Sequence, residues 1–96
     1  EAQPAVFCVD AHQKLIGTLS LRDLILAEAN HAVSQHMETD VDSVPPEMDR
    51  ERVAEIFARY DLLTMPVIDD HGRILGMITI DDVVDILQAE ATEDAL

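Results

Sequence analysis

The sequence predicts a small α/β (α+β) domain built from two copies of one unit of strand, turn, strand and helix. Three observations support this prediction. The chain has 96 residues, 48% of them are hydrophobic and stand in short patterned blocks, and the sequence repeats itself at an offset of 59. The repeat aligns residues 7–24, FCVDAHQKLIGTLSLRDL, with residues 66–83, PVIDDHGRILGMITIDDV. A chain this short buries only about 60 to 65% of its unfolded surface, so we expect a thin core.

Each copy should open with a β-hairpin. Apolar strands are predicted at Val6–Val9 and Leu15–Leu21 in the first copy, and at Met65–Ile68 and Ile74–Ile80 in the second. The polar turns DAHQ and DDHG separate the strands, which is typical of hairpins. Identical residues stand at four equivalent places: Asp10 and Asp69, His12 and His71, Gly17 and Gly76, and Asp23 and Asp82.

A helix should follow each hairpin. The strands end in SLRD and TIDD, which fit a capping box because Ser or Thr can accept from the amide of the third helical residue and Asp suits the positive helix end. Helices are therefore expected from Leu21 and from Ile80. The spacing in the second helix, expected over Asp81–Ala91, separates two faces. The apolar face holds Val83, Val84, Leu87 and Ala91, and the acidic face holds Asp81, Asp82 and Asp85.

A further helix should lie between the copies. Two prolines and Asp49 mark its start, and helical spacing then relates Val53, Ile56, Phe57 and Tyr60. Val41 and Val44 can form a short strand before it. The second copy is therefore expected to be complete over residues 33–91 as strand, helix, strand, strand and helix. The first copy, residues 1–32, should hold only the second half of that pattern.

The charge balance limits the partners that the chain can bind. Six basic and 20 acidic residues give a formal charge of −14, which excludes phosphate-backbone binding as a main role, so no nucleic-acid partner is expected. Cations or basic partners fit better. The simpler alternative is that the charge only keeps a small domain in solution.

Catalysis and membrane insertion find no support in the sequence. Cys8 is the only cysteine, which excludes an intrachain disulfide and favours a cytosolic setting. We expect Cys8 to be a small core residue. The longest uncharged apolar blocks have seven residues, far short of the ~20 that span a bilayer. His12 and His71 stand at positions typical of hairpin turns. The sequence shows no nucleophile together with a base and an orienting group, so we expect that the chain is not an enzyme.

The second copy resembles the cystathionine-β-synthase (CBS) domain family, whose motif is β-α-β-β-α. The stretches YDLLTMPVIDD and QAEATED are further similar to the cytosolic CBS pair of MgtE-type magnesium transporters. This resemblance implies two motifs packed sheet against sheet, and a disc-like homodimer of such pairs. It also implies a transmembrane pore domain in the same full-length chain, reached through the acidic tail at residues 92–96. The residues that carry the resemblance are Pro66, Asp69, Gly72, Gly76, Thr79 and Asp82.

The function implied by this resemblance is sensing of intracellular Mg²⁺ at the cytoplasmic face of the inner or plasma membrane, with gating of the attached pore. Mg²⁺ suits such sites because it prefers oxygen ligands and keeps most of its water. By resemblance, the metal-binding residues are Asp82, Asp85, Glu90, Glu93, Asp94, Asp49, Glu51 and Asp61. Capping alone can explain Asp81 and Asp82, so the hypothesis depends mainly on Asp85, Glu90, Glu93 and Asp94.

An alternative function is a CBS pair that senses ATP or another adenine nucleotide and regulates another host protein. In CBS pairs a Ser/Thr-x-x-Asp segment can present its hydroxyl and carboxylate to the nucleotide. The matching residues here are Ser20, Arg22, Asp23 and Thr79, together with Asp82. Leu62 stands where an aromatic ring could stack on the base, which weakens this alternative. A third alternative is a dimerisation scaffold without a ligand.

Overall fold

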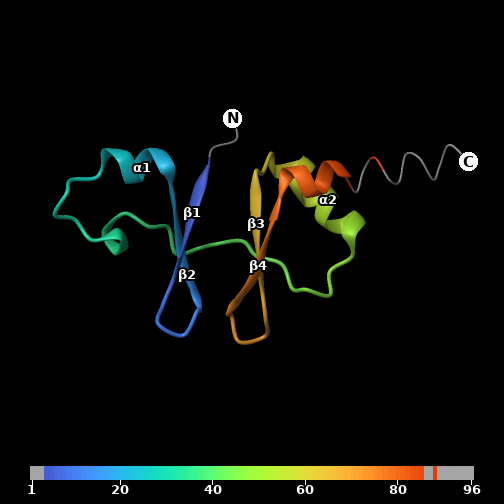
Figure 1. Cartoon of the computed structure of the whole chain (residues 1–96), viewed down its shortest axis with the longest axis horizontal. Helices are drawn as coiled ribbons and strands as arrows, with labels where there is room; N and C mark the ends of the chain where they lie inside the picture. Colours follow the sequence, from blue (N-terminus) through green and yellow to red (C-terminus); the bar gives the residue numbers. More distant parts are fainter. Residues whose placement is uncertain (1–3, 86–87, 89–96) are drawn as a thin grey trace, which may run out of the picture.

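The computed structural model describes residues 4–85 and 88 and places two β-hairpins side by side (Figure 1). In the first copy, β1 (Ala5–Val9) pairs antiparallel with β2 (Leu15–Ser20). In the second copy, β3 (Thr64–Ile68) pairs antiparallel with β4 (Ile74–Thr79). Both predicted hairpins are confirmed, and with them the α/β fold class.

The two hairpins share one register at the offset found in the sequence. Cys8 lies opposite Gly17 in the first hairpin, and Val67 lies opposite Gly76 in the second. The register then shifts by one residue at the same place in both hairpins, between Cys8 and Val9 and between Val67 and Ile68. The repeat is therefore structural, down to the irregularity in each ladder.

The hairpin turns are built on one aspartate each. The Oδ1 atom of Asp69 accepts the backbone N–H groups of His71 at 2.8 Å and Arg73 at 2.9 Å. Asp10 accepts in the same way from the backbone of His12 and Lys14. These hydrogen bonds stabilise the ionised carboxylates, so the pKa values of Asp10 and Asp69 lie below the usual value for aspartate.

The two turns also join the copies to one another. The N–H of Leu15 donates to the carbonyl of Gly72 at 2.9 Å, and the N–H of Ile74 donates to the carbonyl of Gln13 at 2.9 Å. Both acceptors have positive φ, 68° at Gln13 and 80° at Gly72, in the region that favours glycine. A pseudo-twofold axis between the turns therefore relates the two copies.

Two helices begin where the capping signals predicted. The first is α1 (Leu21–Leu26), and the second starts at Ile80 and is described through Asp85. The hydroxyl of Ser20 accepts the N–H of Asp23 at 3.0 Å. In the second copy the roles are reversed, because the carboxylate of Asp82 accepts from the backbone N–H and the hydroxyl of Thr79. Each copy thus retains one half of the capping box.

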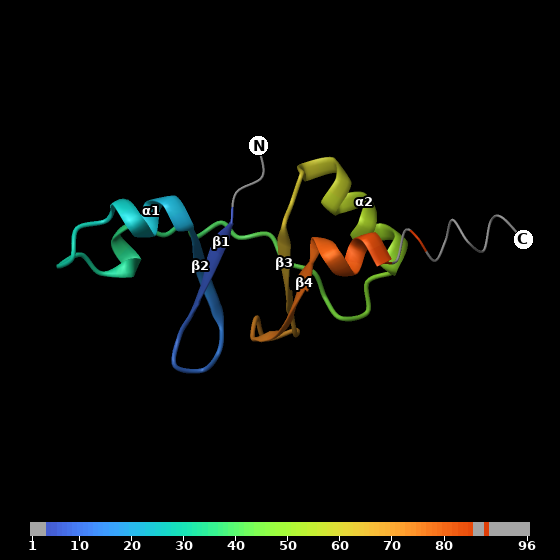
Figure 2. The ribbon, with the colours of Figure 1, turned by 45° about the horizontal axis from the view of Figure 1, so that its top comes forward.

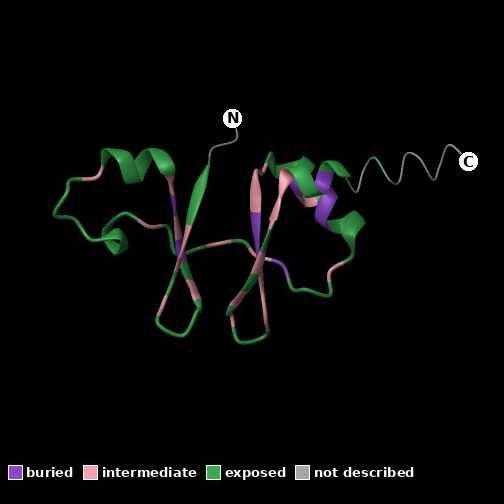
Figure 3. Ribbon diagram, in the orientation of Figure 1, coloured by how far each residue is buried: buried purple, intermediate pink, exposed green. Residues whose placement is uncertain are grey.

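The predicted connecting helix is also confirmed, as α2 (Arg50–Tyr60). Figures 1 and 2 show α2 and the helix after β4 gathered beside the second hairpin. Phe57 is 1% exposed at the centre of this arrangement. The buried core cluster comprises Val44, Val53, Ala54, Phe57, Met65 and Val83, all from the second copy (Figure 3).

Two details differ from the predictions. The strand expected over Val41 to Val44 is reduced to a single parallel bridge between Val44 and Val67, because Pro45 and Pro46 follow and have no N–H to continue a ladder. Val84, expected on the apolar helix face, is 42% exposed, whereas Val83 is 1% exposed. Leu87 and Ala91 of that face lie outside the described residues.

The copies differ most in how much of their apolar surface is covered. Met65 and Val83 of the second copy are 3% and 1% exposed, whereas their equivalents Val6 and Leu24 are 38% and 42% exposed. No residue of α1 is buried. In the second copy α2 provides the cover, and the described part of the first copy has no counterpart of α2 (Figure 3).

Candidate functional site

The predicted metal-binding residues at the second helix are only partly described. Asp82 and Asp85 are exposed, and Asp82 already accepts two hydrogen bonds from Thr79, at 3.3 and 3.2 Å. Asp82 therefore has a structural role whether or not it binds a cation. Glu90, Glu93 and Asp94 lie outside the described residues.

The other predicted acids lie at the two ends of α2. Asp49 precedes the helix, Glu51 lies in its first turn and Asp61 follows its last residue. A hydrogen bond that the protonated Asp49 carboxyl can donate to the Glu51 carboxylate, together with repulsion between the two charges, raises the pKa of Asp49, so these two groups are close neighbours. Since a helix of 11 residues is about 16 Å long, Asp61 cannot share an ion with this pair.

The described residues do not assemble a complete metal centre within one chain. Across residues 4–85 and 88, no group of three or more His, Cys, Asp or Glu side chains is positioned to hold a metal ion. Mg²⁺ requires few direct protein ligands because it retains several waters. A Mg²⁺ site on these acids would therefore be open and weak, or would be completed by carboxylates from another surface.

The residues predicted to contact a nucleotide do not meet in one cavity. The hydroxyl of Ser20 accepts the backbone N–H of Asp23 in capping α1, and the hydroxyl of Thr79 donates to Asp82. Arg22 lies beside the exposed apolar residues of α1, at a hollow that Pro4 and Ile25 also line. Ser20 and Asp23 therefore belong to the start of one helix, and Thr79 and Asp82 to the start of another, in different copies.

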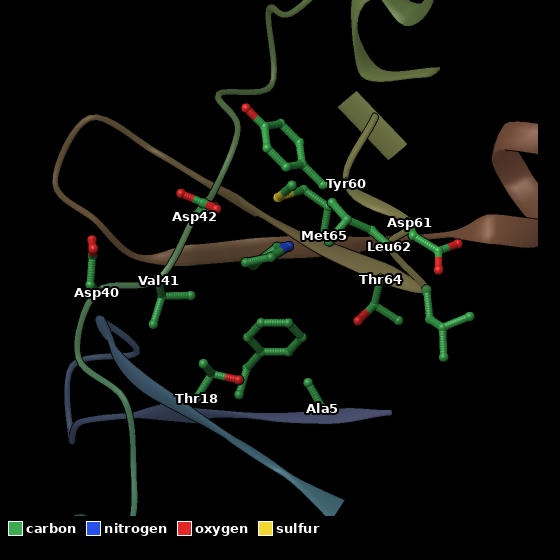
Figure 4. Close-up of a pocket in the computed structure, with 13 residues that line it drawn as sticks. Ala5, Thr18, Asp40, Val41, Asp42, Tyr60, Asp61, Leu62, Thr64 and Met65 are labelled. Atoms are coloured by element: carbon green, nitrogen blue, oxygen red, sulfur yellow. The ribbon is translucent and has the colours of Figure 1, made fainter. Parts of the chain in front are cut away.

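A cavity of about 330 Å³ lies instead between the two copies (Figure 4). This volume falls in the range of small-molecule pockets. Its wall is partly apolar, and Asp40, Asp42 and Asp61 bring three carboxylates to it, while no Lys or Arg lines it. The lining residues are Ala5, Phe7, Thr18, Asp40, Val41, Asp42, Tyr60, Asp61, Leu62, Leu63, Thr64, Met65 and Pro66.

Of the residues that line this cleft between the copies, only Asp61 was predicted from the sequence as a site residue, and Leu62 was noted as a position without the expected aromatic ring. Asp40 and Asp42 were missed, although the run ETDVDS shows acids near the start of the second copy. They reach the cleft because the chain at Glu38 pairs with β2. The N–H of Thr18 donates to the carbonyl of Glu38 at 2.8 Å, and the N–H of Glu38 donates back to Thr18 at 2.7 Å.

Comparison with known proteins identifies the fold family. A sequence profile described as "CBS domain" matches residues 33–89, which is more than half of the chain. The chain belongs to the CBS domain family. The resemblance inferred from the sequence is thereby confirmed, and the pairing of two related motifs agrees with solved CBS pairs.

The CBS chain is similar to magnesium transporters. It is 46% identical over 89 residues to the magnesium transporter MgtE of Thermus thermophilus, and 38% identical to MgtE of Bacillus subtilis. Each match covers 93% of this chain but only 20% of the transporter, so the chain spans about a fifth of these relatives. Within residues 4–85 and 88, no helix has the length and apolar character needed to cross a bilayer.

Two solved structures of magnesium-transport proteins match this chain in fold. The cytosolic domain of the Mg²⁺ channel MgtE, solved in complex with ATP, matches with a TM-score of 0.80 and 41% identity over 85% of this chain and 33% of that chain. The soluble part of a magnesium transporter matches with a TM-score of 0.85 and 37% identity over 91% of this chain and 34% of that chain. The fold therefore matches cytosolic transporter modules.

Proposed function

We propose that this CBS chain is the cytosolic regulatory module of a magnesium transporter, that it senses intracellular Mg²⁺, and that it gates a pore in the same full-length protein. The observation that carries the proposal is the 46% identity to a magnesium transporter over 93% of the chain. The exposed acids and the charge of −14 supply a surface to which a divalent cation would bind. The proposed role is regulatory and not catalytic.

The proposed mechanism is release of electrostatic repulsion between facing acidic surfaces. Two carboxylates ~6 Å apart repel by roughly 3 kcal/mol at an effective dielectric constant of 20. A homodimer that brings such faces together is therefore disfavoured until Mg²⁺ lies between them. Binding to the compact state alone would shift the population toward it, and the attached pore would close.

The proposed Mg²⁺ ligands fall into two groups. The first comprises Asp82 and Asp85 on the helix after β4, together with Glu90, Glu93 and Asp94, which lie outside the described residues. The second lies at the ends of α2 and comprises Asp49, Glu51 and Asp61. Because α2 separates its own acids, at least two distinct cation positions are expected.

We also propose the domain division that the repeat suggests. Residues 1–32 would be the second half of a first CBS motif, residues 33–91 the complete second motif, and residues 92–96 a tail toward the membrane domain. The uncovered Val6 and Leu24 support this division, because their buried equivalents Met65 and Val83 pack against a core that includes α2. A helix of the α2 type, packed on α1, would complete the first motif.

Millimolar Mg²⁺ should raise the unfolding temperature of the chain by on the order of 4 to 8 °C, because about 1 kcal/mol of binding energy has that effect in a domain of this size. The double substitution Asp85→Asn with Glu93→Gln should reduce the shift by half or more. Thermal unfolding in MgCl₂, compared with NaCl at equal ionic strength, measures it.

The matched control is Asp70→Asn with Glu47→Gln, which removes the same charges from exposed positions outside the proposed sites. It should leave the Mg²⁺ shift unchanged. Equal stabilisation by MgCl₂ and NaCl would contradict Mg²⁺ sensing. An equal loss in both double variants would show a general charge effect and would contradict the assignment of Asp85 and Glu93.

A second candidate function is adenine-nucleotide sensing in the cleft between the copies. Two observations favour it: the cavity of about 330 Å³ and the ATP complex of a similar cytosolic domain. Since no Lys or Arg lines the cleft, triphosphate binding should require Mg²⁺ to neutralise the phosphates beside Asp40, Asp42 and Asp61.

Ala5→Trp should weaken ATP binding at least tenfold, because Ala5 is exposed and lines the cleft, so that a large side chain would fill the cavity. Ala58→Trp, at an exposed position of α2 outside that lining, is the control and should bind as the original chain does. Titration with a fluorescent ATP analogue, with and without Mg²⁺, measures both. ATP binding that is unaffected by Ala5→Trp would exclude the cleft. Tight binding that does not depend on Mg²⁺ would favour the nucleotide sensor of another host protein.

A further inference from the structure

The loop after α1 brings two histidine side chains together. The Nδ1 atom of His31 lies 2.9 Å from the Nε2 atom of His36, and the ring centroids are 5.1 Å apart with planes inclined by 23°. Neither histidine belongs to the hairpin turns or to the cleft. One nitrogen of each ring therefore points at the other ring in an exposed part of the chain.

Local hydrogen bonds fix the backbone that carries these rings. The N–H of His31 donates to the carbonyl of Glu28 at 3.0 Å, and the N–H of His36 donates to the carbonyl of Val33 at 3.0 Å. Between them lies the single 3₁₀ turn η1 (Val33–Gln35). The side chain of Gln35 accepts the N–H of Ala32 at 2.8 Å, which closes this turn. The approach of the rings is therefore set by turn geometry within residues 28–36.

The second nitrogen of His31 faces a carboxylate. Its Nε2 atom lies 3.7 Å from Oε2 of Glu28, and the His31 side chain is 36% exposed. Metal-bound histidines commonly donate their other ring N–H to a carboxylate, which fixes the tautomer and orients the ring. A proton on Nε2 beside Glu28 would leave the Nδ1 lone pair free toward His36.

The distance between the two nitrogens is close to that of a chelating pair. Zn–N bonds of about 2.0 to 2.1 Å in tetrahedral geometry place two ligand nitrogens about 3.4 Å apart. An opening of about 0.5 Å from the present separation, with a turn of the rings that aims both lone pairs at the ion, would admit it. Imidazole nitrogen suits Zn²⁺, Ni²⁺ or Cu²⁺, whereas Mg²⁺ prefers oxygen.

We propose that His31 and His36 form a two-nitrogen clamp for a first-row transition-metal ion such as Zn²⁺, bound through Nδ1 of His31 and Nε2 of His36. Water completes the coordination, since the described residues gather no group of three or more metal-ligating side chains here or elsewhere. The clamp would tie the end of α1 to η1 and respond to a different class of cation from the acidic surfaces. It does not depend on the proposed Mg²⁺ function.

Calorimetric titration of the 96-residue chain with Zn²⁺, in buffer containing excess Mg²⁺ to occupy the carboxylates, tests the clamp. The chain should bind one Zn²⁺, and His31→Gln with His36→Gln should weaken that binding at least tenfold. The control is His12→Gln with His71→Gln, since these exposed histidines lie in the hairpin turns and His71 also has an aspartate, Asp70, nearby. The control should bind Zn²⁺ as the original chain does.

Two outcomes would overturn the clamp. Undiminished Zn²⁺ binding by the His31/His36 variant would mean that the rings share only an N–H···N hydrogen bond. Equal weakening in the His12/His71 control would mean that the surface histidines bind Zn²⁺ without distinction. Circular dichroism of each variant shows that the fold is retained, and imidazole ¹⁵N chemical shifts of the Zn²⁺-loaded chain should assign the metal to Nδ1 of His31 and Nε2 of His36.

Discussion

Replacing Phe57 by alanine should lower the free energy of unfolding by about 3 to 5 kcal/mol, the usual cost of emptying a buried aromatic site. Phe57 is 1% exposed and belongs to the core cluster with Val44, Met65 and Val83. Small domains are stable by only about 5 to 15 kcal/mol, so this one substitution removes a large share of the total. The unfolding temperature should fall by more than about 12 °C, as measured by circular dichroism.

Tyr60 provides the matched control because it is an aromatic residue on the same helix, one turn later, and is 60% exposed. Its ring lies under the guanidinium group of Arg59, with 5.6 Å between Cζ and the ring centroid. Such an exposed cation–π contact contributes about 0.5 to 1 kcal/mol, which is all that Tyr60→Ala should cost. Equal costs for the two substitutions would mean that α2 is not held by this core.

The core at Phe57 also positions the proposed binding residues. Asp49 and Glu51 lie at one end of α2, and Asp61 follows the other end at the rim of the cleft. Their spacing is fixed only while α2 stays packed on the second hairpin. Loss of Phe57 should therefore weaken Mg²⁺ and nucleotide binding together, although this residue contacts neither proposed ligand.

The features that the sequence predicted correctly are those that local patterns encode. The hairpin strands follow from apolar blocks around polar turns, and the helix starts at Leu21 and Ile80 follow from Ser20 and Thr79 with an acid three residues later. The offset of 59 between the aligned segments establishes which residues of the two copies are equivalent. The turn and capping signals are local in the chain, and the repeat is found by aligning the chain with itself, so none of these predictions requires a tertiary contact.

The features that could not be predicted are contacts between distant segments. Nothing local indicates that Leu15 donates to Gly72, or that Glu38 pairs with Thr18. Those pairings create the cleft, which is why Asp40 and Asp42 were missed. Exposure of Val84 was missed for a related reason, since the helical pattern gives an apolar face but not how much of that face a neighbour covers.

Gly17→Ala should destabilise the chain by about 1 to 3 kcal/mol, the usual cost of overpacking. A methyl group at Gly17 would lie 2.6 Å from Sδ of Met37 and 2.9 Å from the carbonyl oxygen of Glu38. The methionine side chain can move aside. The carbonyl oxygen of Glu38 cannot, because it accepts the N–H of Thr18 at 2.8 Å and so holds the segment that begins at Glu38 against β2.

Gly76→Ala is the control that the repeat itself provides. Gly76 is the equivalent of Gly17, yet among the described residues no atom outside its chain neighbours lies within 4 Å of a methyl group placed there. Alanine in a strand is favoured over glycine by roughly 0.5 to 1 kcal/mol, so Gly76→Ala should be neutral or slightly stabilising. Denaturant unfolding of both variants measures the difference, and equal effects at the two glycines would contradict the close approach at Gly17.

The double variant Gly17→Ala with Met37→Ala separates the two contacts. If the backbone of Glu38 is the obstacle, removing the methionine side chain should not restore stability, and amide hydrogen exchange at Thr18 and Glu38 should accelerate in both variants. Recovery in the double variant would instead assign the cost to Met37. The segment that begins at Glu38 continues to Asp40 and Asp42, which line the cleft. Displacing this segment should therefore also widen the cleft. Gly17→Ala should therefore weaken nucleotide binding while Gly76→Ala leaves it unchanged, which would connect the close packing at one glycine to the proposed site between the copies.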